Sequence, residues 1–397
     1  MASLAPARPF MTDVAIVQTP LTGAAAGASL GRQIHEQFGG PADALIVFAA
    51  PRGEHAALLE ALAEAAGTRT IVGCSSAGEF TSAEAGEGLT NVTAIRASGM
   101  RFAAAAGRGL ADDPQGASQA IARGFRGAQE PGFPHRAALV LVDALAGHTE
   151  TLIDGLTLAT AGTYRFFGGG AGDDDRFQHT HVFCGTEVLD DAAVALEMVS
   201  LRPLGIGARH GWAPASGPLR VTEADAALVS SLNASPAVEA FAEHAEQTAQ
   251  RFDREGPMPF FLHNIIGVET AGGYKLRVPL GLTEQGGVAC AAEVPAGATT
   301  RIMSCGTTSA TEAAAAAARD AVDQVTRDGG TPKAALFFDC VATRLRLGTG
   351  FNDELAAVSR ELGVPFAGFN SYGQIVRSDG QFSGFHNCTA VVCVLPE

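Results

Sequence analysis

The sequence GCSSAGEF, residues 73–80, ends a pattern that organises the chain. Before it come an apolar run at 44–50, a stretch with helical spacing at 58–66 and a short run of β-formers at 70–72. Apolar runs of this length, bounded by glycine, are typical of buried strands, and the stretch between them favours a helix. The pattern therefore predicts a strand–helix–strand unit of about 30 residues that ends in a glycine turn.

The same pattern occurs twice more, at 137–173 and at 334–374. The first runs begin at residues 44, 137 and 334, and the leading glycines are Gly73, Gly168 and Gly368, so the spacing is 29, 31 and 34 residues. Repetition at a near-constant spacing predicts that one structural unit is repeated along the chain.

These units predict a mixed α/β fold of repeated strand–helix–strand–glycine-turn units with added antiparallel meanders. In open sheets of such units, ligands bind outside the carboxyl ends of the strands, where all three glycine turns are expected. Glycine there allows positive φ and lets the backbone approach a ligand closely. The alternative is that the turns are structural and bind nothing.

Three familiar motifs fail at these turns. The phosphate loop needs a lysine where this chain has Glu79, Asp174 or Gln374, and a carboxylate there would repel a triphosphate. The dinucleotide pattern G-x-G-x-x-G is broken by Asp173, and the nucleophile elbow G-x-S-x-G is incomplete around Ser75 and Ser76. The remaining hydroxyls, amides and carboxylates suit a small polar or cationic ligand better than an anion.

The chain resembles the FIST proteins, which are sensory modules of paired N-terminal and C-terminal FIST domains. The matching segments extend over nearly its whole length: GCSSAGEF (73–80), FFGGGAGDD (166–174), PFF (259–261) with Gly267, YKLRVPL (274–280), LFFDC (336–340) with Arg344, AGFNSYGQI (367–375) and HNCT (386–389). One departure is Gln374, where the first turn suggests Glu.

The resemblance implies two domains, 1–207 and 208–397, and a ligand sensor in signal transduction. FIST proteins often act beside histidine kinases or cyclic-di-nucleotide enzymes, and amino acids have been proposed as their ligands. One branch resembles haem proteins that sense nitric oxide. The expected partner in trans is therefore a histidine kinase or a cyclic-di-nucleotide enzyme.

The candidate ligand-binding residues come from the three turns and from the strand ends that accompany them. They are Gly73, Cys74, Ser75, Ser76, Gly78, Glu79, Gly170, Asp173, Asp339, Arg344, Asn370, Ser371, Tyr372, Gly373, Gln374, His386 and Asn387. In the functional interpretation Arg344 holds a ligand carboxylate while Glu79 or Asp173 receives an amine, so the site would take a zwitterion. The alternative is an internal ion pair between Asp339 and Arg344.

His386 and His263 are candidate ligand-facing imidazoles, either of which could also be a hydrogen-bonded core residue. Because the sequence contains no C-x-x-C-H attachment motif, any haem would be held non-covalently. His179, His181 and Cys184 form the nearest approach to a metal pattern. On a strand Cys184 would face away from the two histidines, so we expect no metal site there.

The net charge of −15 and the sequence pI near 5.1 disfavour nucleic acid and anionic membranes as partners. No stretch has the 18 or so apolar residues that span a bilayer, and residues 1–12 lack the apolar core of a signal peptide. We therefore expect a cytoplasmic protein. Its seven cysteines form no C-x-x-C pair, which disfavours a disulfide framework.

Three hypotheses remain open from the sequence. The first, which we favour, is a ligand-binding sensor without catalysis. The second is an enzyme with Cys74 or Ser75 as nucleophile, for which no base can be placed. The third is an interaction scaffold whose glycine turns bind no ligand.

Overall fold

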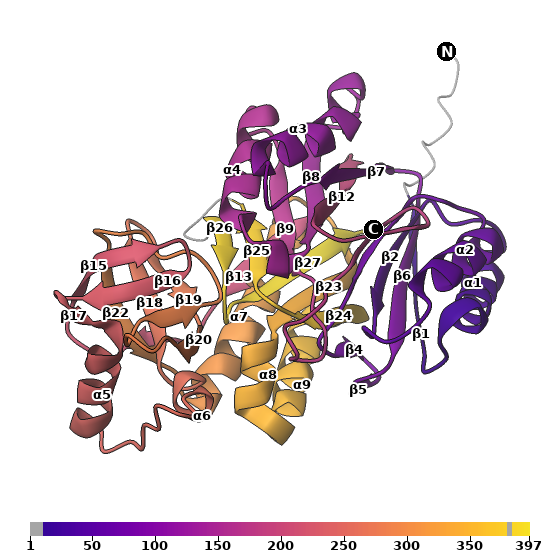
Figure 1. Cartoon of the computed structure of the whole chain (residues 1–397). Coiled ribbons are helices and arrows are strands. Elements are labelled where there is room, and N and C mark those ends of the chain that lie inside the picture. The colour runs from indigo at the N-terminus through magenta and orange to yellow at the C-terminus, as the bar shows by residue number, and fades with distance from the viewer. Residues whose placement is uncertain (1–10, 379–382) are drawn as a thin grey trace, which may run out of the picture.

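The computed structural model describes residues 11–378 and 383–397. The prediction about an N-terminal signal concerns residues 1–12, which lie almost entirely outside that range. Within the described residues, the strands form three six-stranded sheets and one nine-stranded sheet, with helices on their outer faces (Figure 1). The predicted mixed α/β fold is confirmed.

The first sheet carries the GCSSAGEF segment. In spatial order its strands are β1 (Thr12–Thr19), β6 (Thr90–Ala97), β2 (Ala44–Ala49), β3 (Ile71–Ser75), β10 (Val182–Cys184) and β11 (Glu187–Leu189). Helices α1 (Gly23–Phe38) and α2 (His55–Ala66) pack on its outer face through a shared apolar cluster. Strand β2, ALIVFA, is buried at every position, as expected of a strand covered on both faces.

The second and third sheets repeat this arrangement. The second sheet and its helices comprise β7 (Met100–Arg108), α3 (Pro114–Gly124), η1 (Gly127–Gln129), β8 (His135–Val142), η2 (Ala144–Ala146), α4 (Thr149–Ala159), β9 (Arg165–Gly170), β12 (Ala192–Ser200), β25 (Gln374–Arg377) and β26 (Ser383–His386). The third comprise β4 (Glu79–Thr81), β5 (Ala85–Gly86), β13 (Gly205–Arg209), α7 (Thr307–Arg327), β23 (Pro332–Cys340), α8 (Val341–Leu347), η3 (Gly348–Gly350), α9 (Phe351–Leu362), β24 (Phe366–Ser371) and β27 (Ala390–Pro396).

Each of the three sheets is completed by a hairpin that follows a different sheet's glycine segment. Hairpin β4–β5 follows β3 but pairs with β24, β10–β11 follows β9 but pairs with β3, and β25–β26 follows β24 but pairs with β9. The exchange is cyclic, so the three sheets close into one ring. Two of these hairpins, β4–β5 and β25–β26, pair with a strand on the other side of residue 207 in the sequence. The domain boundary placed at residue 207 stays a prediction, which expression of residues 1–207 alone would test.

Between β13 and α7 the chain forms a separate lobe, residues 210–306, on one side of the ring (Figure 1). Its elements are β14 (Ala213–Pro214), β15 (Leu219–Asp225), β16 (Leu228–Leu232), β17 (Ser235–Pro236), α5 (Ala237–Gln247), α6 (Met258–Phe261), β18 (Ile265–Thr270), β19 (Gly273–Arg277), β20 (Pro279–Leu282), β21 (Val288–Cys290) and β22 (Thr299–Ser304). The lobe has an apolar core of its own.

The leading glycines do not lie in turns as the sequence suggested. Gly73, Gly168 and Gly368 are residues of strands β3, β9 and β24. Each faces a backbone carbonyl of the neighbouring parallel strand. A Cβ at these positions would lie 2.3, 2.0 and 1.9 Å from the carbonyl oxygens of the facing strands. Glycine is therefore required there by close strand packing and not by a turn.

The inner faces of the three sheets share a central apolar core. Phe48 of the first sheet lies 4.5 Å from Phe369 of the third, and Phe167 of the second lies 6.1 Å from Phe338 of the third, between ring centroids. Aromatic side chains contributed by all three sheets thus fix the sheets against one another. Among the helices of the described residues, none is long and apolar enough to cross a membrane.

Candidate functional site

The three glycine segments meet where the sheets converge. The Ala77 N–H donates to the Asn370 carbonyl (3.0 Å), Gly172 N–H donates to that of Ser75 (3.0 Å), and Tyr372 N–H donates to that of Gly170 (3.1 Å). The predicted turn residues therefore lie close together, and part of their polarity serves to join the segments.

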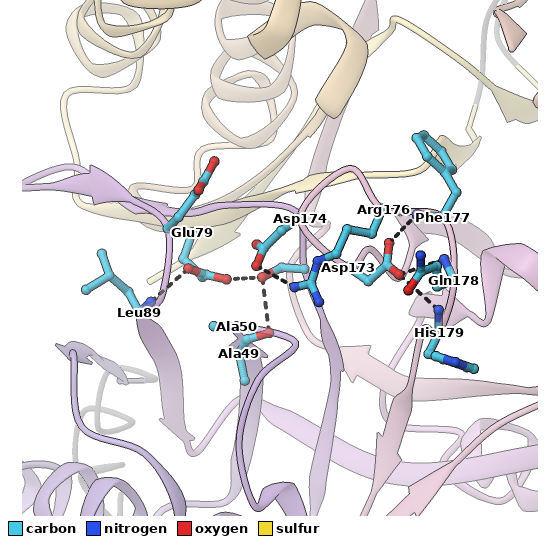
Figure 2. Close-up of polar contacts among 12 residues, drawn as sticks. Ala49, Ala50, Glu79, Leu89, Asp173, Asp174, Arg176, Phe177, Gln178 and His179 are labelled. Atoms are coloured by element: carbon cyan, nitrogen blue, oxygen red, sulfur yellow. Dashed lines mark hydrogen bonds and ion pairs between the residues drawn. The ribbon is translucent and has the colours of Figure 1, made fainter.

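Asp173 and Tyr372 close this junction on one side. The Asp173 carboxylate accepts hydrogen bonds from the backbone N–H groups of Phe177 (2.8 Å), Gln178 (2.8 Å) and His179 (2.9 Å), and from the Tyr372 hydroxyl. Figure 2 shows this carboxylate turned toward loop 177–179. Burial raises the pKa of Asp173, but these hydrogen bonds outweigh it and hold the pKa below its ordinary value. With its oxygens occupied, Asp173 is not placed to receive a ligand amine.

Glu79 and Gln374 occupy equivalent positions in two sheets. Gln374 donates to Ser371 Oγ (2.8 Å), Ser371 Oγ donates to the Asp339 carbonyl (3.0 Å), and the Gln374 side-chain oxygen accepts from Thr389 N–H (3.1 Å). In the first turn, Glu79 contacts Ser76 Oγ, which donates to the Ala49 carbonyl (3.1 Å).

This parallel shows how a glutamine at position 374 can replace the glutamate that the first turn has at position 79. A serine hydroxyl has one proton, so Ser76 donates either to the Glu79 carboxylate or to the Ala49 carbonyl, and in the second case a protonated Glu79 carboxyl would donate to Ser76. Burial raises the pKa of Glu79 to about 7, against hydrogen bonds from Ser76 and Leu89 that lower it. Near neutral pH Glu79 is therefore partly protonated, and its protonated form can make the same bonds as the neutral Gln374 side chain. Glu79 also accepts from Leu89 N–H at 3.0 Å, as Figure 2 shows, so its carboxyl is held by the protein.

Glu79→Gln is expected to remove a pH dependence of stability. Because the folded-state pKa is raised above the unfolded value, the stabilisation is present below about pH 4.5 and is lost as the pH rises through 7. We expect the wild type to lose about 2 kcal/mol relative to Glu79→Gln between pH 5.5 and 8.5. Urea denaturation at both pH values measures this, with exposed Glu64→Gln as control. An equal pH profile for wild type and Glu79→Gln would contradict the assignment.

The third sheet differs from the other two at the carboxyl ends of its parallel strands. The paired residues there are Asp339 and Asn370, where the first sheet has Ala49 and Ser75 and the second has Val142 and Gly170. Register partners point to the same face of a sheet. The third sheet therefore presents a carboxyl and an amide side by side where its equivalents have small or apolar groups.

Gly78 and Arg344 complete this end of the third sheet. Gly78 has φ +122°, and a Cβ there would lie 2.9 Å from Asn370 Oδ1 and 3.3 Å from Arg344 Nη1. Arg344 bonds Glu87 at 2.6 Å, with 20% of the Arg344 side chain and 56% of the Glu87 side chain exposed. The cluster of Gly78, Asp339, Arg344 and Asn370, called here the strand-end cluster, thus reaches from the interior to the surface.

Several buried polar atoms of this region have no hydrogen-bond partner within the described part of the chain. They are Asp339 Oδ2, Arg344 Nε, Asn370 Nδ2, Asp174 Oδ1 and Glu354 Oε1. Buried polar groups are normally satisfied, so each exception calls for an explanation, and ligand binding is one. These atoms include both donors and acceptors, as recognition of a zwitterion requires.

Asp339 and Glu354 form a buried carboxyl pair behind the cluster. Burial raises the pKa of Asp339 to about 6, and burial together with the Asp339 charge raises that of Glu354 well above its ordinary value. The pair therefore keeps a proton to higher pH than two separate carboxyl groups would. Sequence reasoning missed Glu354, although it stands on the apolar face of α9 with Phe351, Leu355 and Val358, where a carboxyl is unexpected.

Asp174 is a further acidic group close to Arg344 of the strand-end cluster. It pairs with Arg176 at 3.1 Å (Figure 2) and interacts electrostatically with Glu87 and Arg344. Burial, more than the charge of Glu87, raises its pKa. The sequence analysis named Asp174 only at the lysine position of the phosphate loop, whereas the structure places it closer to Arg344 than the sequence suggested.

The other predicted residues have structural surroundings. Ser75 Oγ accepts from His181 N–H at 2.9 Å, a Cβ on Gly170 would lie 2.7 Å from Ala144 Cβ, and one on Gly373 would lie 2.1 Å from the Phe385 ring. Cys74 faces the central apolar core, and burial raises its pKa well above the ordinary value. A protonated, inaccessible thiol does not suit a nucleophile.

His386 and Asn387 lie elsewhere. His386 borders a cavity of about 530 Å³ between the ring and the lobe, whose other lining residues include Glu150, Asp154, Arg209, His210 and Lys275. Burial and then the charges of Arg277, Lys275 and His210 hold the pKa of His386 well below its usual range. Asn387 Oδ1 accepts from Val278 N–H at 3.2 Å and so helps to dock the lobe.

These surroundings do not fit a haem. A haem needs an apolar slot for its faces, and the cavity at His386 is lined largely by charged and polar side chains. His263 is exposed. Within the described residues, no group of three or more His, Cys, Asp or Glu side chains is arranged to hold a metal ion.

Comparison with known proteins identifies two family models. The FIST N domain matches residues 43–235, and the FIST C domain matches residues 237–377. No curated protein sequence matches significantly.

Solved structures give only a weak likeness. PurL of Thermotoga maritima with FGAR has a TM-score of 0.26 and 12% identity, over 98% of this chain and 73% of that chain. The AMPPCP complex has a TM-score of 0.23 and 13% identity, over 97% and 72%. Scores this low support no conclusion about fold or function.

Proposed function

The chain belongs to the FIST family of sensory domains, and on that premise we propose that it senses a small zwitterion, such as an amino acid, at the strand-end cluster. FIST domains are sensory and not catalytic. We further propose that the ligand binds at this cluster in a protein located in the cytoplasm. The signal would pass in trans to a histidine kinase or a cyclic-di-nucleotide enzyme.

One observation carries the proposal. The strand-end cluster has unpartnered donors, Arg344 Nε and Asn370 Nδ2, at a strand end where α/β proteins bind ligands, with the Asp339 carboxyl, which is paired with Glu354, and the unpartnered Asp174 Oδ1 close by. The other two sheets have no such pair at the equivalent positions.

The chemistry of each group suggests its role. The Arg344 guanidinium offers a planar set of N–H donors that suits a ligand carboxylate, and Asn370 adds a further donor. The Asp174 or Asp339 carboxyl would receive the ligand ammonium group. Gly78 lacks a side chain where one would fill the space between Asn370 and Arg344.

A thermal-shift screen tests the proposal. We expect one or more of the twenty amino acids to raise the melting temperature, whereas propionate and ethylamine, which each carry one of the two charges, do not. At a concentration 100-fold above Kd the ligand should add about 2.7 kcal/mol of stability. A screen in which no zwitterion acts, or in which propionate acts equally, would refute the proposal.

The visible absorption spectrum distinguishes a zwitterion sensor from a haem protein that senses a gas. We expect protein produced with haem available to show no Soret band that depends on His386. A Soret band lost in His386→Ala would instead establish the haem reading.

A further inference from the structure

Two cysteines outside the strand-end cluster lie against each other. Strand β23 ends at Cys340, and the last pair of its ladder with β27 is Phe338 with Val391. Continuing that register brings Cys340 opposite Thr389, whose neighbour is Cys388. Both cysteines belong to one buried apolar cluster, and each thiol shifts the pKa of the other.

The two cysteines stand at neighbouring strand ends. Opposite residues of an antiparallel pair have Cα atoms about 4.5–5.5 Å apart, and Cys388 directly precedes the residue opposite Cys340, in the same apolar cluster. Cys388 also has φ +48°, in the left-handed region that residues other than glycine seldom occupy. Such conformations collect at functional segments.

The two thiols differ in acidity. The hydrogen bond from Cys388 lowers the pKa of Cys340, although burial and the nearby Asp339 raise it. The hydrogen bond to Cys340 and burial raise the pKa of Cys388 well above its ordinary value. Other charged groups facing the pair are Arg346, whose guanidinium also lies over the Trp212 ring at 5.2 Å, and Glu354 behind Asp339.

We propose that Cys340 and Cys388 form a redox-active dithiol, which hydroperoxides oxidise to an intramolecular disulfide with Cys340 as the attacking thiolate and Cys388 as the resolving thiol. The two residues are 3% and 5% exposed, so a small oxidant is required. This proposal does not depend on the ligand of the strand-end cluster.

The chemistry proceeds in two steps. The Cys340 thiolate attacks one peroxide oxygen, so that an S–O bond forms, the O–O bond breaks, and the leaving oxygen takes up the proton released by the thiol. The Cys388 sulfur then attacks the Cys340 sulfur, an S–S bond forms, and water leaves with the second thiol proton. Two thiols lose two electrons and two protons, and hydrogen peroxide is reduced to two waters.

Such a bond would connect two functional parts of the molecule. Cys340 stands between Asp339 and α8, which carries Arg344, and Cys388 follows Asn387, which docks the lobe. The cysteines also belong to the apolar cluster with Trp212, Met303 and Leu276 of the lobe. Oxidation would therefore change the junction between ring and lobe beside the strand-end cluster.

Peptide mapping of the full chain tests the proposal directly. Trypsin releases Cys340 in residues 334–344 and Cys388 in residues 378–397. After treatment of the folded, reduced protein with hydrogen peroxide, we expect these peptides to be linked in about one bond per chain, reversibly by dithiothreitol. We expect the Cys340 thiol to be lost at least about tenfold faster than that of Cys74.

Variants separate the pair from the other buried thiols. Because Cys393 is in the same peptide as Cys388, the link should persist in Cys393→Ala and disappear in Cys388→Ala and Cys340→Ala. Cys74→Ala, in the central core, serves as a matched control. Peptide mapping of the wild-type protein still tests the proposal if a variant folds poorly. Absence of the link in the folded wild type, or its persistence in Cys388→Ala, would overturn the proposal.

Discussion

Gly368→Ala is expected to prevent folding or to destabilise the protein by about 3 kcal/mol or more. The new Cβ would lie 1.9 Å from the Phe337 carbonyl oxygen and 2.4 Å from the ring of Phe80. Neither group can move freely, since Phe337 belongs to the paired strand β23 and Phe80 to the exchanged hairpin strand β4. The substitution would therefore separate β24 from both of its neighbours.

The equivalent glycines provide a series. In Gly73→Ala the Cβ would lie 2.3 Å from the Val47 carbonyl oxygen, and in Gly168→Ala it would lie 2.0 Å from that of Val140, at φ +143°. We expect both variants to be destabilised strongly. When the strands of one sheet separate, that sheet also loses its pairing with the hairpin that comes from another unit. Soluble yield, circular dichroism and urea denaturation measure the effect.

The matched control is Gly217→Ala. No atom lies within 4 Å of a Cβ at that position, and its φ is not in the positive range where alanine is strained. We expect its stability to equal that of the wild type within about 0.5 kcal/mol. If Gly368→Ala folded with wild-type stability, the strands could accept a side chain there without a loss of stability. That result would contradict the role given to these glycines.

Local patterns were sufficient to predict the strand–helix–strand core of each repeated unit in the ring. The apolar runs at 44–50, 137–142 and 334–338 are buried strands, and the helical stretches between them and the next strands are helices. These elements depend on side chains near in sequence. The prediction failed for the leading glycines, because glycine in a crowded strand and glycine in a turn look alike in a sequence.

Strand exchange could not be predicted from the sequence. Whether β4 pairs with its own sheet or with β24, more than 280 residues away, depends on contacts that no local pattern records. For the same reason the arrangement of the candidate site could be predicted only in part. Arg344, Asn370 and Asp339 were found at a strand end, but their approach to Gly78 follows from the exchange that brings the first turn to the third sheet.

The roles of the acidic residues depended on counting hydrogen bonds. Asp173 and Asp174 are neighbours with the same side chain, yet Asp173 accepts three backbone N–H groups, whereas Asp174 keeps an unpartnered oxygen beside Arg344 among the described residues. Glu79, predicted as a ligand for an amine, is bonded to Ser76 and Leu89, much as Gln374 is bonded to Ser371 and Thr389. Such distinctions need coordinates.

Arg344→Ala is expected to weaken the binding of any zwitterion identified by the thermal-shift screen at least about 100-fold, or about 2.7 kcal/mol. Loss of a guanidinium that holds a partly buried carboxylate removes charge-assisted hydrogen bonds and leaves the ligand charge unpaired. Arg344→Lys should recover little of the affinity, because a lysine ammonium cannot reproduce the planar pair of donors. Isothermal titration calorimetry measures both.

Stability should change little in these variants, which separates loss of binding from loss of folding. The bond from Arg344 to Glu87 is at the surface, and such pairs contribute about 0–1 kcal/mol. Glu87→Gln tests this bond alone and should leave zwitterion affinity within about threefold of wild type. Arg360→Ala, at the exposed end of α9, is a charge-matched control.

Asn370→Ala should also weaken binding, by about tenfold, since it removes one neutral donor and not a charge. The ranking of Arg344→Ala above Asn370→Ala, with Arg360→Ala unchanged, is what carboxylate recognition at the strand-end cluster requires. Equal affinity in Arg344→Ala and wild type would remove Arg344 from the site, even if a zwitterion binds. Because the screen and this series can fail separately, they distinguish a wrong ligand class from a wrong place.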